Sequence, residues 1–270
     1  MTLSTYHSHT ELCDGKSTME EMILSAIAAG CREIGLSPHS VIHGENWCLD
    51  EAKYLTYLER ARVLKQKYSS DISVYIGIEQ DYTSPVVDYG AFDYIIGSVH
   101  SVRVADREFW VDISMPEVRE VVEKYFGGDP YAYTGAYYER LSRIYEVTRC
   151  DIIGHFDLVT KFIERDPLFD TSHPRYVAAR DEAFASLLKT PALFEINTGA
   201  ISRGYRTSAY PEPAVVDMIA AYGKPFVINS DSHNKDTVTF GISEEQHRLD
   251  SLGYPYVTSM RELLSHTRKI

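Results

Sequence analysis

Short apolar segments recur along this chain, and most of them end on a side chain that can bind a metal ion. Residues 93–100 read Asp-Tyr-Ile-Ile-Gly-Ser-Val-His, and residues 150–155 end on Ile-Ile-Gly-His in the same way. About seven such strands alternate with helical segments, a pattern typical of a mostly parallel sheet covered by helices. The residues at the strand ends are His7, His9, His39, Glu79, His100, His155, Asp231 and His233.

A closed parallel barrel would bring these side chains together, because all of its strands end at one mouth. His7 and His9 are two residues apart and share one face of a strand, as do Asp231 and His233. Asp14 follows the first strand in a turn and can add an oxygen ligand. The sequence therefore predicts an α/β barrel with a metal site at the carboxyl ends of its strands.

The kinds of ligand indicate which ions this site takes and how many. Histidine and carboxylate without thiolate suit zinc, manganese or iron. The candidate ligands are too many for one ion, so we expect two or three ions that share a bridging carboxylate. Clusters of this kind are typical of phosphoester hydrolysis, in which one ion activates water and another binds phosphoryl oxygens.

Composition limits the alternatives. The 270 residues, 44% of them hydrophobic, suit one domain over residues 1–270, since we find no repeat or linker. The formal net charge of -12 argues against a nucleic-acid partner. No apolar run is long enough to predict a membrane-spanning helix. The cysteines include no Cys-x-x-Cys pair, which predicts reduced thiols in a cytoplasmic protein.

Capping signals bound the predicted helices. Ser17-Thr18-Met19-Glu20 resembles a capping box, and Asp50 can begin a long helix that runs to about Tyr68. Residues 103–135 are less regular, and we expect an insertion there with one helix near 116–126. We expect a loop over 198–210, and further helices over 130–148, 174–189, 213–222, 243–252 and 259–268.

Six short motifs carry a resemblance to a known family. They are His7-Ser8-His9, Ser37-Pro38-His39, Gly77-Ile78-Glu79, Gly97-Ser98-Val99-His100, Gly154-His155 and Asn229-Ser230-Asp231-Ser232-His233. In kind and order they resemble the motifs of the polymerase-and-histidinol-phosphatase (PHP) domain family. Within it the chain is similar to the monofunctional histidinol-phosphate phosphatases, on its length and on Cys13-Asp14-Gly15 and Glu195-Ile196-Asn197-Thr198.

The resemblance implies a distorted seven-stranded (β/α) barrel that binds three divalent ions. Its first ion would be bound by His7, His9, Glu79 and Asp231. Its second ion would share Glu79 and add His100 and His155. Its third ion would take Asp14, His39 and His233. Many members of the family carry a histidine where Asp14 stands, so the identity of the third ion can differ here.

The implied activity is hydrolysis of L-histidinol phosphate to L-histidinol and phosphate, a step of histidine biosynthesis, by a metal-bound hydroxide. Asp231 or His233 would pass a proton to the leaving alkoxide. Arg203 and Lys161 follow predicted strands and are our candidates to bind the phosphate. Asp157 is a candidate to orient a metal ligand. The candidates to contact the ammonium and imidazole groups are Tyr82, Phe109, Trp110 and Glu195.

Three other functions are compatible with parts of the sequence. The chain could be a phosphatase or phosphodiesterase for another small phosphoester. It could be a metal-binding scaffold or sensor without turnover, although the complete ligand set argues against this. An amidohydrolase-type barrel also opens with His-x-His, but here no lysine ends a middle strand. The oligomeric state is not predicted.

Overall fold

One parallel sheet organises the structure, a computed structural model that describes residues 2–85 and 88–268. In these residues seven strands form the sheet, in the order β1-β2-β3-β4-β7-β8-β9. The strands are β1 (Leu3–Thr5), β2 (Cys31–Leu36), β3 (Ser73–Asp81), β4 (Tyr94–Ser98), β7 (Ile152–Ile153), β8 (Leu193–Asn197) and β9 (Phe226–Asn229).

The first and last strands of this sheet meet just beyond their ends. Ser8 and Ser232 form a parallel bridge, and the backbone N–H of His9 donates to the carbonyl of Ser232 at 2.8 Å. The sheet is therefore nearly closed, which confirms the predicted distorted (β/α)7 barrel. Because all strands run in parallel, their carboxyl ends lie at one mouth.

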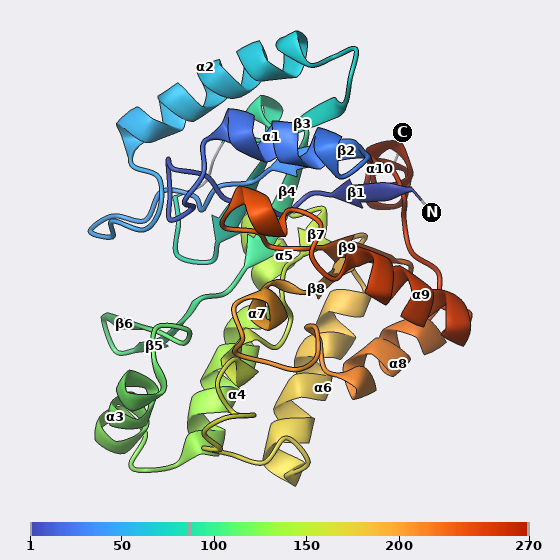
Figure 1. Ribbon diagram of the computed structural model, residues 1–270. Helices are drawn as coiled ribbons and strands as arrows, with labels where there is room; N and C mark the ends of the chain where they lie inside the picture. The colour runs from blue at the N-terminus through green and yellow to red at the C-terminus, as the bar shows by residue number, and fades with distance from the viewer. Residues whose placement is uncertain (1, 86–87, 269–270) are drawn as a thin grey trace.

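Helices cover the outside of the barrel. Figure 1 shows α1 and α2 along one side of the barrel and α4, α6 and α8 along the opposite side. The longer helices are α1 (Met19–Ala28), α2 (Glu51–Lys67), α3 (Met115–Tyr125), α4 (Pro130–Leu141), α6 (Pro174–Leu188), α8 (Pro213–Ala221), α9 (Ile242–Leu252) and α10 (Met260–Thr267). The short ones are α5 (Ile144–Thr148), α7 (Gly199–Ser202) and the 3-10 turns Tyr89–Ala91, Leu158–Thr160 and Lys235–Thr237.

Alternate strand residues separate the barrel interior from the layer under the helices. On β4, Tyr94 and Ile96 belong to the interior cluster, whereas Ile95 belongs to the larger cluster between sheet and helices. Gly35 on β2 and Gly77 on β3 leave space for the Tyr94 side chain, since a Cβ atom at either glycine would overlap it. Side-chain alternation then places Glu79 on the same inner face as Gly77, one layer closer to the mouth.

Helix starts agree with the sequence prediction, with one shift. Asp50 accepts a hydrogen bond from the backbone N–H of Lys53 at 2.7 Å and begins α2 as predicted. The capping box of α1 lies one residue later than predicted and pairs Thr18 with Glu21. Ser17 does not cap this helix, because its hydroxyl accepts from the backbone N–H of Lys235 at 3.0 Å.

The prediction of a single helix in 103–135 was incomplete. Helix α3 is present, but it follows an antiparallel hairpin of β5 (Ser101–Val104) and β6 (Arg107–Trp110). The hairpin turn has Ala105 at φ 54°, a place where glycine or asparagine is the usual signal. The predicted helix over 130–148 is divided into α4 and α5, and the predicted loop over 198–210 contains α7.

Two further predictions concern the chain as a whole. No helix among the described residues is both long and apolar enough to cross a lipid bilayer. The thiols of Cys13, Cys31, Cys48 and Cys150 form no disulfide, and all except that of Cys13 are buried.

Candidate metal centre

Three buried polar atoms face one another at the mouth of the barrel. They are Nε2 of His7, Nε2 of His9 and Oε2 of Glu79, and none of them makes a hydrogen bond to a described residue. These residues offer ligand atoms within 4.8 Å of one another. Buried polar atoms normally make hydrogen bonds, so a converging set of nitrogen and oxygen ligands without them fits a cation. Oδ1 of Asp231 completes the group, 3.1 Å from Nε2 of His9.

Glu79 lies at the centre of the wider cluster. Its Oε1 is 2.9 Å from Nε2 of His155 and 3.4 Å from Nε2 of His100. Its Oε2 is 2.7 Å from Nδ1 of His39. A carboxylate with imidazoles on both oxygens is suited to bridge two ions.

A third group of candidate ligands surrounds Asp14 and includes His9, His39 and His233. Oδ2 of Asp14 is 3.1 Å from Nε2 of His233, and its Oδ1 is 3.6 Å from Nε2 of His39. The turn that carries Asp14 is tightly packed, since a Cβ atom on Gly15 would lie 2.6 Å from the carbonyl carbon of His9. Lys16 also donates its backbone N–H to the carbonyl of His233 at 2.7 Å, which joins the turn to the segment that follows β9.

The structure thus brings every residue predicted as a metal ligand to one end of the barrel. His39 lies between two groups, because it is close to Glu79 and His100 as well as to Asp14. His9 is shared in the same way between the groups of Glu79 and Asp14. The assignment of each ligand to a particular ion stays a prediction.

Glu195 supports this cluster from beneath and does not line the cavity. Its Oε1 lies 2.7 Å from Nδ1 of His7, and its Oε2 accepts from the backbone N–H of His155 at 2.8 Å. Asn229 and Asn197 each donate a further hydrogen bond to it at 2.9 Å. The expected contact between Glu195 and substrate is therefore wrong, because strand alternation places this side chain inside the barrel below the ligands.

Asp81 orients His100 as Glu195 orients His7, and it was not predicted from the sequence. Its Oδ2 lies 2.9 Å from Nδ1 of His100, and its Oδ1 accepts from the backbone N–H of Thr83 at 2.7 Å. The signal was present, since Asp81 follows Glu79 by two residues and shares its strand face. Asp157, the residue that we expected in this role, instead accepts from the backbone N–H of Glu212 at 2.7 Å.

The electrostatics of the cluster favour the ionised form of its carboxylates. Burial opposes the charge on His7, His39 and His100, but these carboxylates outweigh it and raise the pKa of all three histidines. Burial opposes ionisation of Glu79, but His39, His7 and His100 outweigh it and hold its pKa well below the ordinary value. Burial is likewise outweighed at Asp231 by Arg203 and His7, and the pKa of Asp231 is well below its usual range. Burial, together with His233 and His39, lowers the pKa of His9 to about 3 and keeps its imidazole neutral.

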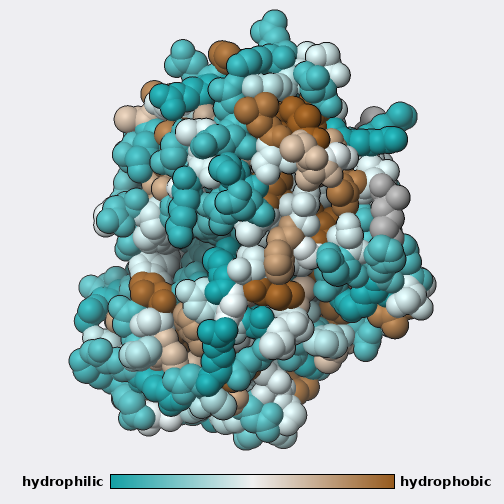
Figure 2. Space-filling model, in the orientation of Figure 1, coloured by the Kyte–Doolittle hydropathy of each residue, from teal (hydrophilic) through white to brown (hydrophobic). Residues whose placement is uncertain are grey.

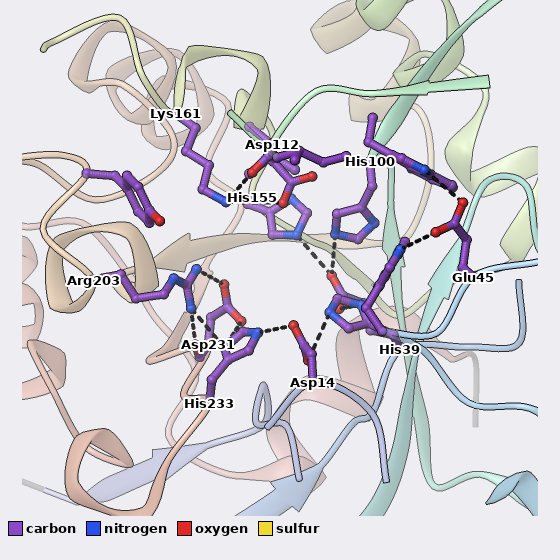
Figure 3. Close-up of a pocket in the computed structure, with 16 residues that line it drawn as sticks. Asp14, His39, Glu45, His100, Asp112, His155, Lys161, Arg203, Asp231 and His233 are labelled. Carbon is purple, nitrogen blue, oxygen red and sulfur yellow. Dashed lines mark hydrogen bonds and ion pairs between the residues drawn. The ribbon is translucent and has the colours of Figure 1, made fainter. Parts of the chain in front are cut away.

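A cavity of about 390 Å³ lies over the cluster. Figure 2 shows the surface hollowed at the left, between the α1–α2 layer and the β5–β6 hairpin, with mostly hydrophilic side chains around the hollow. Arg203 and Lys161 both line this cavity (Figure 3). Arg203 donates to the carbonyl of Asp231 at 2.9 Å, and Lys161 donates to the carbonyl of Asp112 at 2.8 Å.

The aromatic candidates separate into one inside the cavity and two outside it. Trp110 lines the cavity as expected. The expected substrate contacts of Tyr82 and Phe109 are wrong, because Tyr82 packs against the guanidinium of Arg140 and Phe109 against the ring of Tyr125. Six further residues line the cavity and were not predicted from the sequence: Glu45, Trp47, Asp112, Ile113, Leu158 and Tyr205.

Comparisons with known proteins agree with this architecture. Three curated relatives align over most of the chain. A "Probable histidinol-phosphatase" of Schizosaccharomyces pombe is 26% identical and covers 92% of this chain and 86% of its own length. A protein with the same name from Deinococcus radiodurans is also 26% identical, over 93% of this chain and 94% of its own. A "Histidinol-phosphatase" of Bacillus subtilis is 22% identical, over 87% and 94%.

Two solved structures share the fold. HisK from Listeria monocytogenes superposes with a TM-score of 0.78 at 23% identity, over 90% of this chain and 99% of its own. Histidinol phosphate phosphatase from Lactococcus lactis subsp. lactis, solved with zinc, L-histidinol and phosphate, has a TM-score of 0.68 at 18% identity, over 94% and 95%. The model of the PHP domain matches residues 5–199, well over half of the chain. This protein therefore belongs to the PHP domain family.

Proposed function

We propose that this protein is a metal-dependent phosphomonoesterase that hydrolyses L-histidinol phosphate to L-histidinol and phosphate. The observation that carries the proposal is the convergence of buried ligand atoms of His7, His9 and Glu79, which make no hydrogen bond to a described residue, beneath a cavity lined by two cationic side chains. The names of the curated relatives support the choice of substrate.

The ligand groups suit three divalent ions, with zinc, manganese or iron as the candidates. His7, His9, Glu79 and Asp231 would hold the first, and Glu79 would share the second with His100 and His155. Asp14, His39 and His233 would hold the third. Ions in such a cluster supply an activated water near neutral pH and neutralise phosphoryl charge.

The protein's own cations would position the phosphate. The Arg203 guanidinium presents a planar fork of N–H donors at the cavity, and such a fork matches two phosphoryl oxygens at once. Its Nη2 lies 3.1 Å from Oδ2 of Asp231, which fixes the orientation of the fork. Lys161 adds a second positive charge to the cavity wall.

Asp231 or His233 is the residue proposed to pass a proton to the leaving alkoxide. Both side chains line the cavity, and Nδ1 of His233 lies 3.0 Å from the carbonyl of Asp231. The backbone of Asp231 has φ 46°, a left-handed conformation that costs energy outside glycine and is often retained at functional sites. This conformation occurs at the residue that contacts Arg203 on one side and His9 on the other.

The test is phosphate release from a panel of esters. The panel contains L-histidinol phosphate, p-nitrophenyl phosphate and a dinucleotide diester. We expect kcat/KM to be highest for L-histidinol phosphate and negligible for the diester. Equal rates on the two monoesters, or a preference for the diester, would show that the substrate is a different phosphoester.

A further inference from the structure

The outer cavity has two chemically different sides. Figure 3 shows Lys161 and Arg203 on one side and Glu45 on the other, with the candidate metal ligands between them. Each cation already faces a carboxylate, since Lys161 Nζ lies 3.2 Å from Asp112 Oδ2 and Arg203 is paired with Asp231. Glu45 lines the same cavity, yet it forms no ion pair with any residue that the structure describes.

Two tryptophans hold the Glu45 carboxylate in place. Its Oε2 accepts the indole N–H of Trp47 at 2.9 Å, and its Oε1 accepts that of Trp110 at 3.0 Å. The two indole rings are nearly perpendicular, with centroids 5.2 Å apart. Each carboxylate oxygen keeps a further lone pair after accepting one N–H. The carboxylate is therefore fixed in position, while no cation of residues 2–85 and 88–268 pairs with its negative charge.

Trp47 connects this carboxylate to the candidate metal ligands. Its ring centroid lies 4.9 Å from that of His39 and 5.9 Å from that of His100. Both histidines face Glu79, where the phosphoryl group is proposed to react. An aromatic wall thus begins beside the reaction centre and ends at Glu45. Because Glu45 lines the same cavity as Arg203, Lys161 and the candidate metal ligands, it faces the space that a bound phosphoester would occupy.

We propose that Glu45, with Trp47 and Trp110, forms the subsite that selects phosphomonoesters carrying a cationic nitrogen near the ester oxygen. This inference rests on the proposed function and names the substrate class of that site. The carboxylate accepts N–H groups of the cation, and the indole faces contact the cation and any attached ring. A molecule with a negative phosphate and a positive amine then matches the two sides of the cavity.

The test uses Glu45→Gln, which removes the charge and keeps an oxygen acceptor for an indole N–H. We would measure kcat/KM for L-histidinol phosphate against p-nitrophenyl phosphate, and for O-phosphoethanolamine against ethyl phosphate. The second pair differs only in the ammonium group. We expect a loss of about 10- to 100-fold for the cationic ester of each pair, mainly through KM, and a change within about twofold for the others.

Two further variants serve as controls for this experiment. Glu51→Gln is the matched control, because Glu51 is a carboxylate with 75% of its side chain exposed at the start of α2, outside this cavity. It should leave all four substrates unaffected. Trp110→Phe keeps an aromatic ring and removes one hydrogen bond to Glu45, so it should give a smaller loss on the cationic esters alone. A thermal unfolding curve for each variant checks that it is folded.

Some outcomes overturn the subsite. An equal loss on cationic and uncharged esters in Glu45→Gln, or no loss on either, contradicts it. So does a wild-type protein with no preference for O-phosphoethanolamine over ethyl phosphate. Failure of the proposed function is distinguishable, because it would appear as no turnover of L-histidinol phosphate. If the ethanolamine preference were then present and lost in Glu45→Gln, the subsite would be supported for another amino-alcohol phosphate.

Discussion

Glu195 and His7 form a buried pair beneath the candidate metal ligands, with Oε1 of Glu195 2.7 Å from Nδ1 of His7 and both side chains fully buried. A carboxylate in this place makes Nδ1 the protonated nitrogen and turns Nε2 toward Glu79. Burial opposes the charge on Glu195, but His7 outweighs it and lowers the pKa of the carboxyl. Glu195 is thus a positioning residue for the metal centre.

Replacing this carboxylate should weaken metal binding. In Glu195→Gln the amide N–H₂ would face N–H groups whose hydrogen bonds the carboxylate now accepts. Loss of such a supporting partner typically lowers metal affinity by about 10- to 100-fold. The measurement is metal content per chain after dialysis against increasing chelator concentrations. The exposed Glu244→Gln on α9 is the control. Resistance to chelator equal to that of the wild type would contradict the positioning role.

Arg203 should contribute to the binding of phosphate in every substrate. Arg203→Lys keeps the charge but removes the planar fork, and we expect kcat/KM to fall about 10- to 100-fold for L-histidinol phosphate and p-nitrophenyl phosphate alike. Inhibition by inorganic phosphate should weaken in parallel. Arg165→Lys, at an exposed position outside the cavity, is the matched control. Unchanged phosphate inhibition in Arg203→Lys would exclude this role.

Adding a single methyl group inside the barrel should lower the stability of the fold. Gly77→Ala would press a Cβ atom into the Tyr94 ring, which neighbouring strands enclose, and we expect a loss of about 1–3 kcal/mol in the free energy of unfolding. Gly135→Ala on α4 is the control, since no atom of the described part of the chain lies within 4 Å of its added Cβ atom and alanine favours a helix. Urea unfolding of both variants measures the difference. Equal stability would show that Tyr94 can move aside.

The sequence predicted the ligand cluster well for a physical reason. Each ligand follows or ends a strand, and parallel strands of one barrel must end at one mouth, so local pattern was enough. The cavity wall is different. Glu45 and Trp110 are 65 residues apart in the chain, and no periodicity relates a loop after β2 to the end of a hairpin. The hairpin itself lacked a sequence signal, because its turn contains Ala105 in place of glycine.

The thiols give a prediction that depends on pH. Burial raises the pKa of Cys31 to about 11. Burial is also the main reason that the pKa of Cys150 is raised to about 12. The thiolate is the reactive form, so both residues keep the inert thiol at pH 8 and the thiolate fraction grows as pH rises. We expect alkylation by iodoacetamide at pH 8 to be about 100-fold slower in the native than in the urea-unfolded protein. Mass spectrometry of the two peptides would show comparable rates if this were wrong.

The ligands around Glu79 are proposed to hold the ions that hydrolysis of L-histidinol phosphate requires. The direct measurement is metal content per chain and phosphate release on the same sample, before chelation, after it, and after zinc or manganese is restored. We predict that activity falls with metal content and returns with the metal in the wild type, while Glu79→Gln regains neither. Full activity on L-histidinol phosphate in chelated, metal-depleted protein would show that hydrolysis does not require these ions.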